Sequence, residues 1–239
     1  MWAQVGEQSG SGPISVAHVC AAAVTGAEVD GVGLTVMVNP TAQETVYATD
    51  GVAGELEELQ LTLGEGPCVD TFTDGGGPVL ATDLRSPACL VRWPAFTPAA
   101  LDAGARAAFA LPLQIGVIRL GVLDLYRSRP GPLSSHQLAA ALAFAETAGM
   151  LLLDEATGTR FDTVGRPWQP DDPTVHEAVV HQATGMILVQ LGVSVEAAFA
   201  RLRAYAYTQD RRLGDVAREV VDRRLRFDPD PPPDGDDGF

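Results

Sequence analysis

The chain has 239 residues, 46% of them apolar, which is enough for two domains of ordinary size with their own cores. It contains no lysine, which excludes a P-loop, a Schiff-base enzyme and a lysine-dependent kinase. The formal net charge is −15, which at first argues against a nucleic-acid partner.

No part of the sequence indicates export or membrane insertion. Nothing has the pattern of a signal peptide, and the longest apolar window, 138–153, is interrupted by Glu146 and Thr147 and falls short of the ~18 residues that a membrane span needs. The three cysteines show no repeating spacing, which fits a reducing cytoplasm better than a disulfide framework. We therefore expect a cytoplasmic protein with no membrane partner.

Residues 1–12 are polar and Gly/Ser-rich, which predicts a disordered leader. Residues 13–157 then carry paired strand-like runs with helical segments before and after them, which indicates an α+β domain with an antiparallel sheet. The predicted helical segments are 14–25, 53–61, a turn into a helix at 64–72, an alanine-rich stretch at 95–105, and 134–156 with Ser134 or Ser135 as its cap. The predicted strands are 33–38, 44–49, 79–83, 107–115 and 117–127.

Five motifs in this segment resemble a GAF domain, a small-molecule sensing fold. They are Leu56-x-x-Leu59-Gln60, Gly64-Glu65-Gly66-Pro67-Cys68, Arg92-Trp93-Pro94, Pro112-Leu113, and Gly121-Val122-Leu123-Asp124-Leu125-Tyr126. Leu133 stands where the family usually has an aromatic residue. The resemblance implies a GAF sensor domain at 13–157 whose signal is a small molecule, a redox state or a protein partner. It does not name the ligand, because GAF domains share a shape more than a ligand.

Two segments predict no packed structure. Residues 158–173 are rich in Gly, Pro and Asp without a sustained period and read as a linker, in which Trp168 is a candidate to hold one domain against the other. Residues 229–239 are acidic and proline-rich, which predicts a disordered tail.

Residues 174–228 show three successive helical periods. Gly192 closes the first, Ser194 is a good N-cap for the second, and Arg211-Arg212-Leu213 opens the third. Each helix has one apolar stripe and is too short to be stable alone, so a three-helix bundle is expected. The stripes are Val180, Ala183, Ile187 and Leu191; Val195, Phe199, Leu202 and Ala206; and Leu213, Val216, Ala217, Val220 and Val221.

The bundle resembles the ANTAR domain, an RNA-binding module of bacterial transcription antitermination regulators. The residues that carry the resemblance are Ala183-x-Gly185, Ala198-Phe199-x-x-Leu202-Arg203 and Arg211-Arg212-Leu213-x-Asp215-Val216-Ala217. The family implies binding of tandem hairpins with short, six-nucleotide loops in nascent transcripts. Two hairpins imply two bundles and hence a homodimer, through helix 134–156 or the GAF sheet.

The charge is distributed unevenly along the chain. Residues 173–228 hold eight arginines against seven acidic residues, a balance of +1, whereas residues 1–172 carry −12 and the last eleven residues −4. The bundle is thus the least acidic part of the molecule. RNA binding there should depend on specific contacts to loop bases more than on a broad electrostatic field.

The resemblance implies RNA contacts by Arg203, Arg211 and Arg212, and we add Arg218 from its place on the same polar side of the third helix. The alternative for that side is a solvated face with Asp215–Arg218 and Arg218–Asp222 pairs. Ala183 and Gly185 lack bulk and allow close approach of a neighbouring helix or of a nucleotide. Tyr205 and Tyr207 are candidates to stack on loop bases, with core packing as the alternative, which is favoured for Tyr205.

Cys20, Cys68 and Cys89 are candidates for redox chemistry, because one branch of GAF proteins reduces free methionine sulfoxide. No motif of that enzyme is present, so buried apolar packing is the preferred interpretation. The four histidines do not have metal-ligand spacing, since His176 and His181 are five residues apart. The Gly64-x-Gly66 turn and Trp93 are interpreted as structural, with a ligand contact at the turn as the alternative. We expect no catalytic residue, no metal and no cofactor.

The sequence therefore predicts a non-enzymatic regulator in which a GAF domain senses a signal and an ANTAR domain binds RNA. Two alternatives remain, a helical DNA-binding regulator and a GAF-type free methionine sulfoxide reductase.

Overall fold

The computed structural model describes residues 5, 14–39, 42–73, 77–156, 173–209 and 211–228. The chain divides into two compact units, Met1–Thr174 and Val175–Phe239, and each unit is described by itself. Most of the predicted leader, nearly all of the predicted linker with Trp168, and the predicted tail lie outside the described residues.

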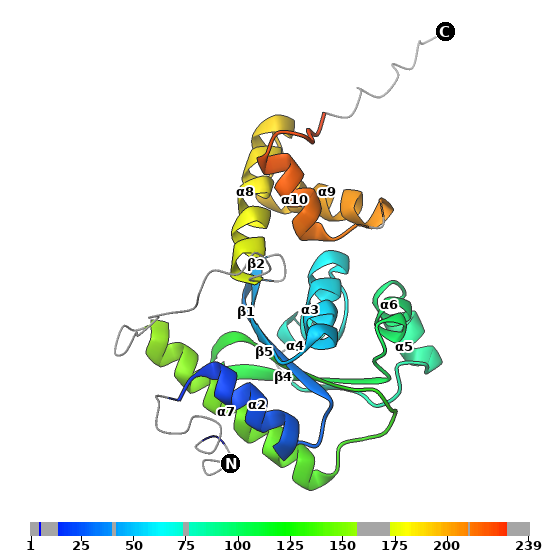
Figure 1. Cartoon of the computed structure of the whole chain (residues 1–239), viewed down its shortest axis with the longest axis vertical. Coiled ribbons are helices and arrows are strands. Elements are labelled where there is room, and N and C mark those ends of the chain that lie inside the picture. Colours follow the sequence, from blue (N-terminus) through cyan, green and yellow to red (C-terminus); the bar gives the residue numbers. More distant parts are fainter. Residues whose placement is uncertain are drawn as a thin grey trace. The chain divides into compact units, whose positions relative to one another are not determined.

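The N-terminal unit is built on an antiparallel sheet with the order β2-β1-β5-β4-β3 (Figure 1). Strands β4 and β5 form a hairpin in the middle of the sheet, and β1 pairs with the other side of β5. The strands are β1 (Gly31–Asn39), β2 (Ala42–Ala48), β3 (Val79–Ala81), β4 (Ala107–Ile115) and β5 (Ile118–Arg127).

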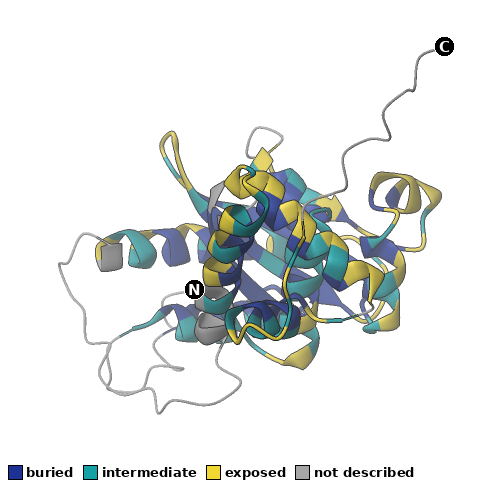
Figure 2. Cartoon of the chain, turned by 90° about the horizontal axis from the view of Figure 1, so that it is seen from above, coloured by how far each residue is buried: buried dark blue, intermediate teal, exposed yellow. Residues whose placement is uncertain are grey.

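Helices cover both faces of this sheet. Helix α2 (Val16–Gly26) and helix α7 (Ser135–Ala156) pack together on one face, as Figure 1 shows. The other face carries α3 (Gly51–Leu63), α4 (Pro67–Thr73), α5 (Pro87–Arg92) and α6 (Phe96–Asp102). Buried residues lie along the strands and on the helix faces that turn toward them (Figure 2).

The alternation of side chains along the central hairpin divides the core in two. On β5, Leu123 and Leu125 join the cluster beneath α2 and α7, whereas Tyr126 belongs to the cluster beneath α3, α5 and α6. On β4, Phe109 and Leu111 likewise join the first cluster. Successive side chains of a strand point to opposite faces, so both faces of this sheet must be covered. Asp124 lies on the α3 side of the sheet, near Glu57 of α3.

The predicted elements of this unit are confirmed, with shifts of a few residues at their ends. Strand 107–115 has the predicted bounds, and Ser134 caps α7 by accepting a hydrogen bond from the Gln137 amide at 3.2 Å. Strand β3 is shorter than predicted, since it ends at Ala81. Helix α5 is not predicted from the sequence. Ser86 caps it and Pro87 is at its first position, which favours a helix start, but six residues are too few to show a helical period.

The C-terminal unit consists of α8 (Pro173–Leu191), α9 (Val195–Thr208) and α10 (Leu213–Val221). Gly192 ends α8 with φ +65°, and the Ser194 hydroxyl caps α9 by accepting from the Ala197 amide, both as predicted. The axes of α8 and α9 differ in direction by 107°. The buried core of this unit contains the predicted stripe residues Val180, Ala183, Ile187, Phe199, Leu202, Ala206, Leu213, Val216, Ala217 and Val220.

Helix α7 is long and apolar enough to cross a membrane by length and composition alone, over Ser135–Asp154, although the sequence window looked too short. The bent pair α8 and α9 passes the same test as one broken span. In α7, however, Ala141, Phe144, Ala145 and Ala148 are fully buried in the cluster shared with α2 and the sheet. A third of this apolar window is buried inside the N-terminal unit.

The close pairing of β1 and β5 depends on Gly121, and this gives a first prediction. A Cβ at Gly121 would collide with the Thr35 carbonyl and come within 2.8 Å of Val36 Cα, both of them backbone atoms of β1. Gly121→Ala is expected to destabilise the N-terminal unit by about 1–3 kcal/mol, because backbone cannot move aside as a side chain can. Chemical denaturation measures the change.

Gly51→Ala is the matched control. A Cβ there meets nothing within 4 Å, and Gly51 opens α3. Its stability should stay the same or rise by less than about 1 kcal/mol. Equal behaviour of the two variants would contradict the proposed role of Gly121.

Candidate nucleic-acid interface and buried acidic pocket

Four arginines proposed for RNA binding lie on or beside α9 and α10. Arg203 is on α9 with its guanidinium 5.6 Å from the centre of the Phe199 ring. Arg212 is the N-cap residue of α10, and Arg211 precedes it. Arg218 is in the last turn of α10. The helix that the sequence suggests from Arg211 therefore begins two residues later, because Arg212 has extended backbone angles, φ −65° and ψ 138°.

Arg211 and Arg218 each pair with a carboxylate of α10. Arg211 makes two hydrogen bonds with Glu219, at 2.9 and 3.0 Å, and Arg218 bonds Asp215 at 3.0 Å. Of the two pairs that the sequence offers for this side of the helix, Arg218–Asp215 is present, and Asp222 pairs with Arg224 at 2.8 Å. The side chains of both pairs are about a third to a half exposed. The Glu219 carboxylate raises the pKa of Arg211 and has its own pKa lowered in return.

The two small residues of α8 have different surroundings. Ala183 is fully buried, so its small side chain serves the packing of α8 in the bundle. Gly185 is exposed, and a Cβ added there would meet nothing within 4 Å. Only Gly185 therefore offers a bare stretch of helix surface to an outside molecule.

The two candidate stacking residues, Tyr205 and Tyr207, also differ in their surroundings. Tyr205 packs edge-on against Phe227, with ring centroids 5.5 Å apart, and the Phe227 amide donates to Gln190 Oε1. Tyr205 is thus a packing residue, as favoured from the sequence. Tyr207 is 60% exposed.

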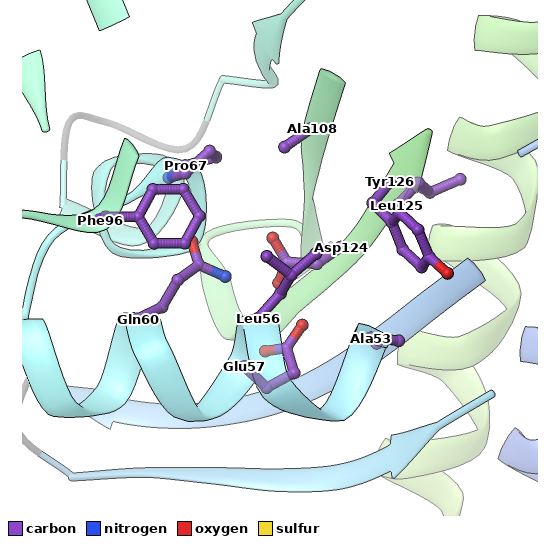
Figure 3. Close-up of a pocket in the computed structure, with 11 residues that line it drawn as sticks. Ala53, Leu56, Glu57, Gln60, Pro67, Phe96, Ala108, Asp124, Leu125 and Tyr126 are labelled. Atoms are coloured by element: carbon purple, nitrogen blue, oxygen red, sulfur yellow. The ribbon is translucent and has the colours of Figure 1, made fainter. Parts of the chain in front are cut away.

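A second candidate site lies inside the N-terminal unit, between the sheet and the helices α3 and α4. A cavity of about 20 Å³ lies here among apolar side chains and three polar ones, Glu57, Gln60 and Asp124. Figure 3 shows Glu57 of α3 and Asp124 of β5 pointing toward each other across it. The apolar lining includes Ala53, Leu56, Pro67 and Phe96.

Glu57, Asp124 and Cys68 form a buried cluster. One ligand atom of each residue lies within 4.8 Å of those of the other two. Glu57 is 3% and Cys68 1% exposed, and Asp124 Oδ2 is buried without a hydrogen-bond partner among the described residues. Glu57 Oε2 accepts a hydrogen bond from the Thr35 hydroxyl at 2.7 Å. The three residues come from α3, α4 and β5, so only the fold brings them together.

Glycines make room for this cluster. Gly33 of β1 is the cross-strand partner of Asp124, and a Cβ on Gly33 would collide with the Glu57 carboxylate. Gly66, with φ +134°, leaves space in the same way for Gln60. The partner of Asp124 on the other side is Ala110. Small residues on both neighbouring strands thus allow two acids to be buried where the pattern elsewhere is apolar.

Burial changes the acidity of all three groups. It raises the pKa of Glu57 well above the usual value, and the nearby Asp124 carboxyl raises it further. Burial also raises the pKa of Asp124, to about 7, although the neighbouring polar groups of Cys68, Gln60 and Glu57 act to lower it. The pKa of the Cys68 thiol is raised by burial and then by the two acids. Two carboxyls this close share a proton more readily than they both ionise.

The Gly64–Gly66 turn has the structural role preferred from the sequence. Gly64 has φ +66° and closes α3. The Cys68 amide, at the start of α4, donates to Gln60 Oε1 at 2.7 Å. That amide is therefore satisfied within the protein. Trp93 is likewise a packing residue: it is 2% exposed, and its indole nitrogen donates to Asp70 at 2.9 Å.

The cysteines are dispersed through the core. Cys20, Cys68 and Cys89 are all buried and belong to three different apolar clusters. Burial raises the pKa of Cys20 to about 12. Thiols with raised pKa values are poor nucleophiles, because the thiolate is the reactive form. Of the histidines, His136 and His181 are exposed and His18 bonds Ser15 at the start of α2.

Comparison with known families identifies the C-terminal unit. The family model of the ANTAR domain matches residues 175–221, which spans α8, α9 and α10 almost completely. The chain therefore carries an ANTAR domain, and such a domain implies an RNA-binding regulator of transcription antitermination. Among curated proteins, none matches the chain.

The N-terminal unit is similar to several solved structures. The GAF domain of a phosphoenolpyruvate-protein phosphotransferase from Coxiella burnetii is 14% identical, with a TM-score of 0.48 over 66% of this chain and 94% of that one. The GAF-B domain of DevS from Mycobacterium smegmatis is 21% identical, with a TM-score of 0.40 over 59% and 93%. A type II free methionine-R-sulfoxide reductase from Thermoplasma acidophilum is 14% identical, with a TM-score of 0.40 over 64% and 94%. Similarities this distant name neither the ligand nor the activity of this chain.

The Glu57–Cys68–Asp124 cluster is not evident from the sequence, because its three residues lie 11 and 56 positions apart and follow no metal-ligand spacing. One sequence signal exists. Asp124 interrupts the apolar strand Gly121–Tyr126, and Glu57 lies between Leu56 and Leu59 on the apolar side of its helix. Charged residues are rarely buried unless they have a partner.

Burying Glu57 beside Asp124 should lower stability, which gives a second prediction. The raised pKa of Glu57 means that its ionised form is disfavoured by folding. This penalty is absent below the pKa of the unfolded chain, near 4.5, and grows as the pH rises toward the native pKa. In chelator-treated protein at pH 8, Glu57→Gln should therefore raise Tm by roughly 2–8 °C, or about 1–2 kcal/mol.

At pH 5 the gain should be much smaller. Glu55→Gln, on the exposed side of the same helix, is the control and should change Tm little at either pH. Thermal unfolding followed by circular dichroism tests this. A Glu57→Gln variant that is less stable at pH 8 than at pH 5, relative to wild type, would show that the carboxylate stabilises the fold.

Proposed function

We propose that this protein is a cytoplasmic, non-enzymatic regulator that binds hairpins in nascent transcripts through its ANTAR domain and prevents terminator formation or hides a ribosome site. The observation that carries the proposal is the ANTAR match at 175–221 on a unit with arginines along its surface. The N-terminal unit is the sensor: its sheet and helices agree with the architecture that the GAF resemblance implies.

Arg203, Arg211, Arg212 and Arg218 are the proposed RNA ligands. Their guanidinium groups present flat forks that suit phosphate oxygens and base edges. The pairs of Arg211 with Glu219 and of Arg218 with Asp215 orient these forks when no RNA is bound. Exposed ion pairs contribute little stability, so exchanging a carboxylate for a phosphate is inexpensive. The carboxylates also limit nonspecific binding to any polyanion.

Gly185 is the proposed point of close backbone approach, and Tyr207 is the proposed stacking residue. Both are exposed within the described part of the unit. Ala183 supports the site indirectly, since it fixes how α8 packs.

The proposed regulator is a homodimer, because two hairpins need two ANTAR domains. Helix α7 is the proposed dimer element, with the sheet as the alternative. Leu142 and Met150 of α7 are 41% and 42% exposed and lie eight residues apart, a little over two turns, so they differ by about 80° around the helix axis.

The cysteine arrangement favours a regulator over a methionine sulfoxide reductase. That reaction needs a thiolate and a resolving thiol close together, and these three thiols lie in separate clusters. We expect no turnover of free methionine sulfoxide with a thiol reductant, and Cys68→Ser or Cys89→Ser would abolish any turnover that is seen.

The third prediction concerns the paired arginines. Arg211→Ala with Arg212→Ala should weaken binding to a tandem hairpin RNA at least about tenfold, because two phosphate or base contacts are lost. Arg223→Ala with Arg224→Ala is the matched control, since it removes the same two charges from exposed, adjacent residues of the same unit. Fluorescence anisotropy with the RNA measures both. Equal loss in the two double variants would mean that only net charge matters.

The fourth prediction uses the open space at Gly185. Gly185→Ala should stabilise α8 by up to about 1 kcal/mol, because alanine favours a helix more than glycine does. If a nucleotide approaches the backbone here, the same variant should bind the hairpin RNA several-fold more weakly. Unchanged affinity would remove Gly185 from the interface, and the stability gain shows that the unit remains folded.

A DNA-binding regulator is the remaining alternative, because small helical units also bind duplex DNA. A gel shift that compares the hairpin RNA with duplex DNA of the same sequence distinguishes them. The proposal requires preference for the RNA; preference for the duplex would replace it with the alternative.

A further inference from the structure

We propose that Glu57, Cys68 and Asp124 of the N-terminal unit bind one divalent transition-metal ion of the Zn²⁺ type. This proposal deepens the proposed function, because it names the class of ligand that the sensor domain binds. Only the idea that the ion acts as a signal rests on the proposed function.

The geometry of the three donors suits a single ion. Ligand atoms around a tetrahedral Zn²⁺ lie roughly 3.3–3.8 Å apart, because Zn–O and Zn–S bonds measure about 2.0–2.3 Å. One carboxylate oxygen each of Glu57 and Asp124 and the sulfur of Cys68 already lie within 4.8 Å of one another. Small side-chain movements into the space between them would complete the contacts.

The surroundings of Glu57 and Asp124 favour the binding of a cation. Asp124 Oδ2 is buried with no hydrogen-bond partner among the described residues. The charged groups that act on Glu57 and Cys68 are other members of the cluster, and all are acids. Buried charges in proteins are paired or coordinate metals. A dication would replace the protons that these donors hold in the free protein, since carboxylates and thiols bind metal in their deprotonated forms.

The size of the cavity determines the class of ligand. A cavity of about 20 Å³ holds one water-sized species. Pockets for nucleotides or other small organic ligands measure roughly 300–1,000 Å³. The cavity that Glu57 and Asp124 line therefore accommodates an ion, with at most one water molecule, and no organic molecule. Cys68 is not among its lining residues, but its sulfur lies within 4.8 Å of one oxygen of each carboxylate.

The donor set determines the class of ion. Mg²⁺ and Ca²⁺ prefer six or more oxygen ligands, which this apolar cavity does not supply. Thiolate together with carboxylates suits zinc and its transition-metal neighbours. The Cys68 thiol lies 3.9 Å from the Met37 thioether, so a second sulfur is near the same end of the cluster. Gln60 Oε1, which accepts from the Cys68 amide, holds the start of α4 in place as an outer support.

The full-length protein, stripped of metal by chelator and kept reduced, is titrated with Zn²⁺ alone against a chromophoric chelator. Wild type should bind one equivalent. Cys68→Ser and Asp124→Asn should each weaken that binding at least about 100-fold. Cys20→Ser and Cys89→Ser remove buried thiols outside the cluster and serve as matched controls, so they should bind like wild type.

Titration with Co²⁺ adds a structural readout. Thiolate coordination gives a sulfur-to-cobalt charge-transfer absorption, expected in wild type and in Cys89→Ser and absent in Cys68→Ser. Circular dichroism shows whether each variant folds. If Cys68→Ser does not fold, Asp124→Asn is used to test the proposal. Mg²⁺ and Ca²⁺ should not compete with Zn²⁺ at equal concentration.

Stoichiometric binding that survives both Cys68→Ser and Asp124→Asn, or no binding by wild type, would overturn the proposal and leave an acid pair that shares a proton. Hairpin RNA binding is measured on the same samples. Loss of RNA binding with intact Zn²⁺ binding would count against the regulator and leave the metal site standing, so the two failures are distinguishable.

Discussion

The structure of the N-terminal unit depends on one interaction, the burial of the Glu57 carboxyl against that of Asp124. The sheet around it is apolar on both faces, and a pair of acids between the sheet and α3 opposes folding unless something compensates for it. Several features of the fold make room for this pair or bond to it. Gly33 has no side chain where the Glu57 carboxylate lies, Gly66 leaves space for Gln60, and Thr35 donates to Glu57. A unit built only for stability would place a leucine at either position.

The C-terminal unit uses charge in the opposite way. Its paired arginines lie near the surface and its core is apolar, so its carboxylates pair with arginines instead of being buried. The acidic side chains of this unit orient Arg211 and Arg218 at little energetic cost. With a balance of only +1, the unit has a weak overall electrostatic field, which disfavours nonspecific binding to polyanions.

Both units illustrate where prediction from sequence succeeded. Helices α8, α9 and α10 follow from apolar stripes at helical spacing and from Gly192 and Ser194 at their ends, which are local signals that the fold preserves. The central hairpin follows from two long β-rich runs. Helix α5 is missed because six residues hold too little periodicity, and α10 begins later than expected because Arg212 acts as its cap and not as its first turn.

The sequence by itself determined the elements, the division into two kinds of unit and the resemblance of each, because these depend on neighbours close along the chain. Only the tertiary structure decided that Ala183 is a packing residue, that Arg211 pairs with Glu219, and that Glu57, Cys68 and Asp124 meet. Those facts depend on which residues from separate elements come within a few ångströms. Strand alternation puts Asp124 on one face, but the packing of α3 and α4 on that face decides what it meets there.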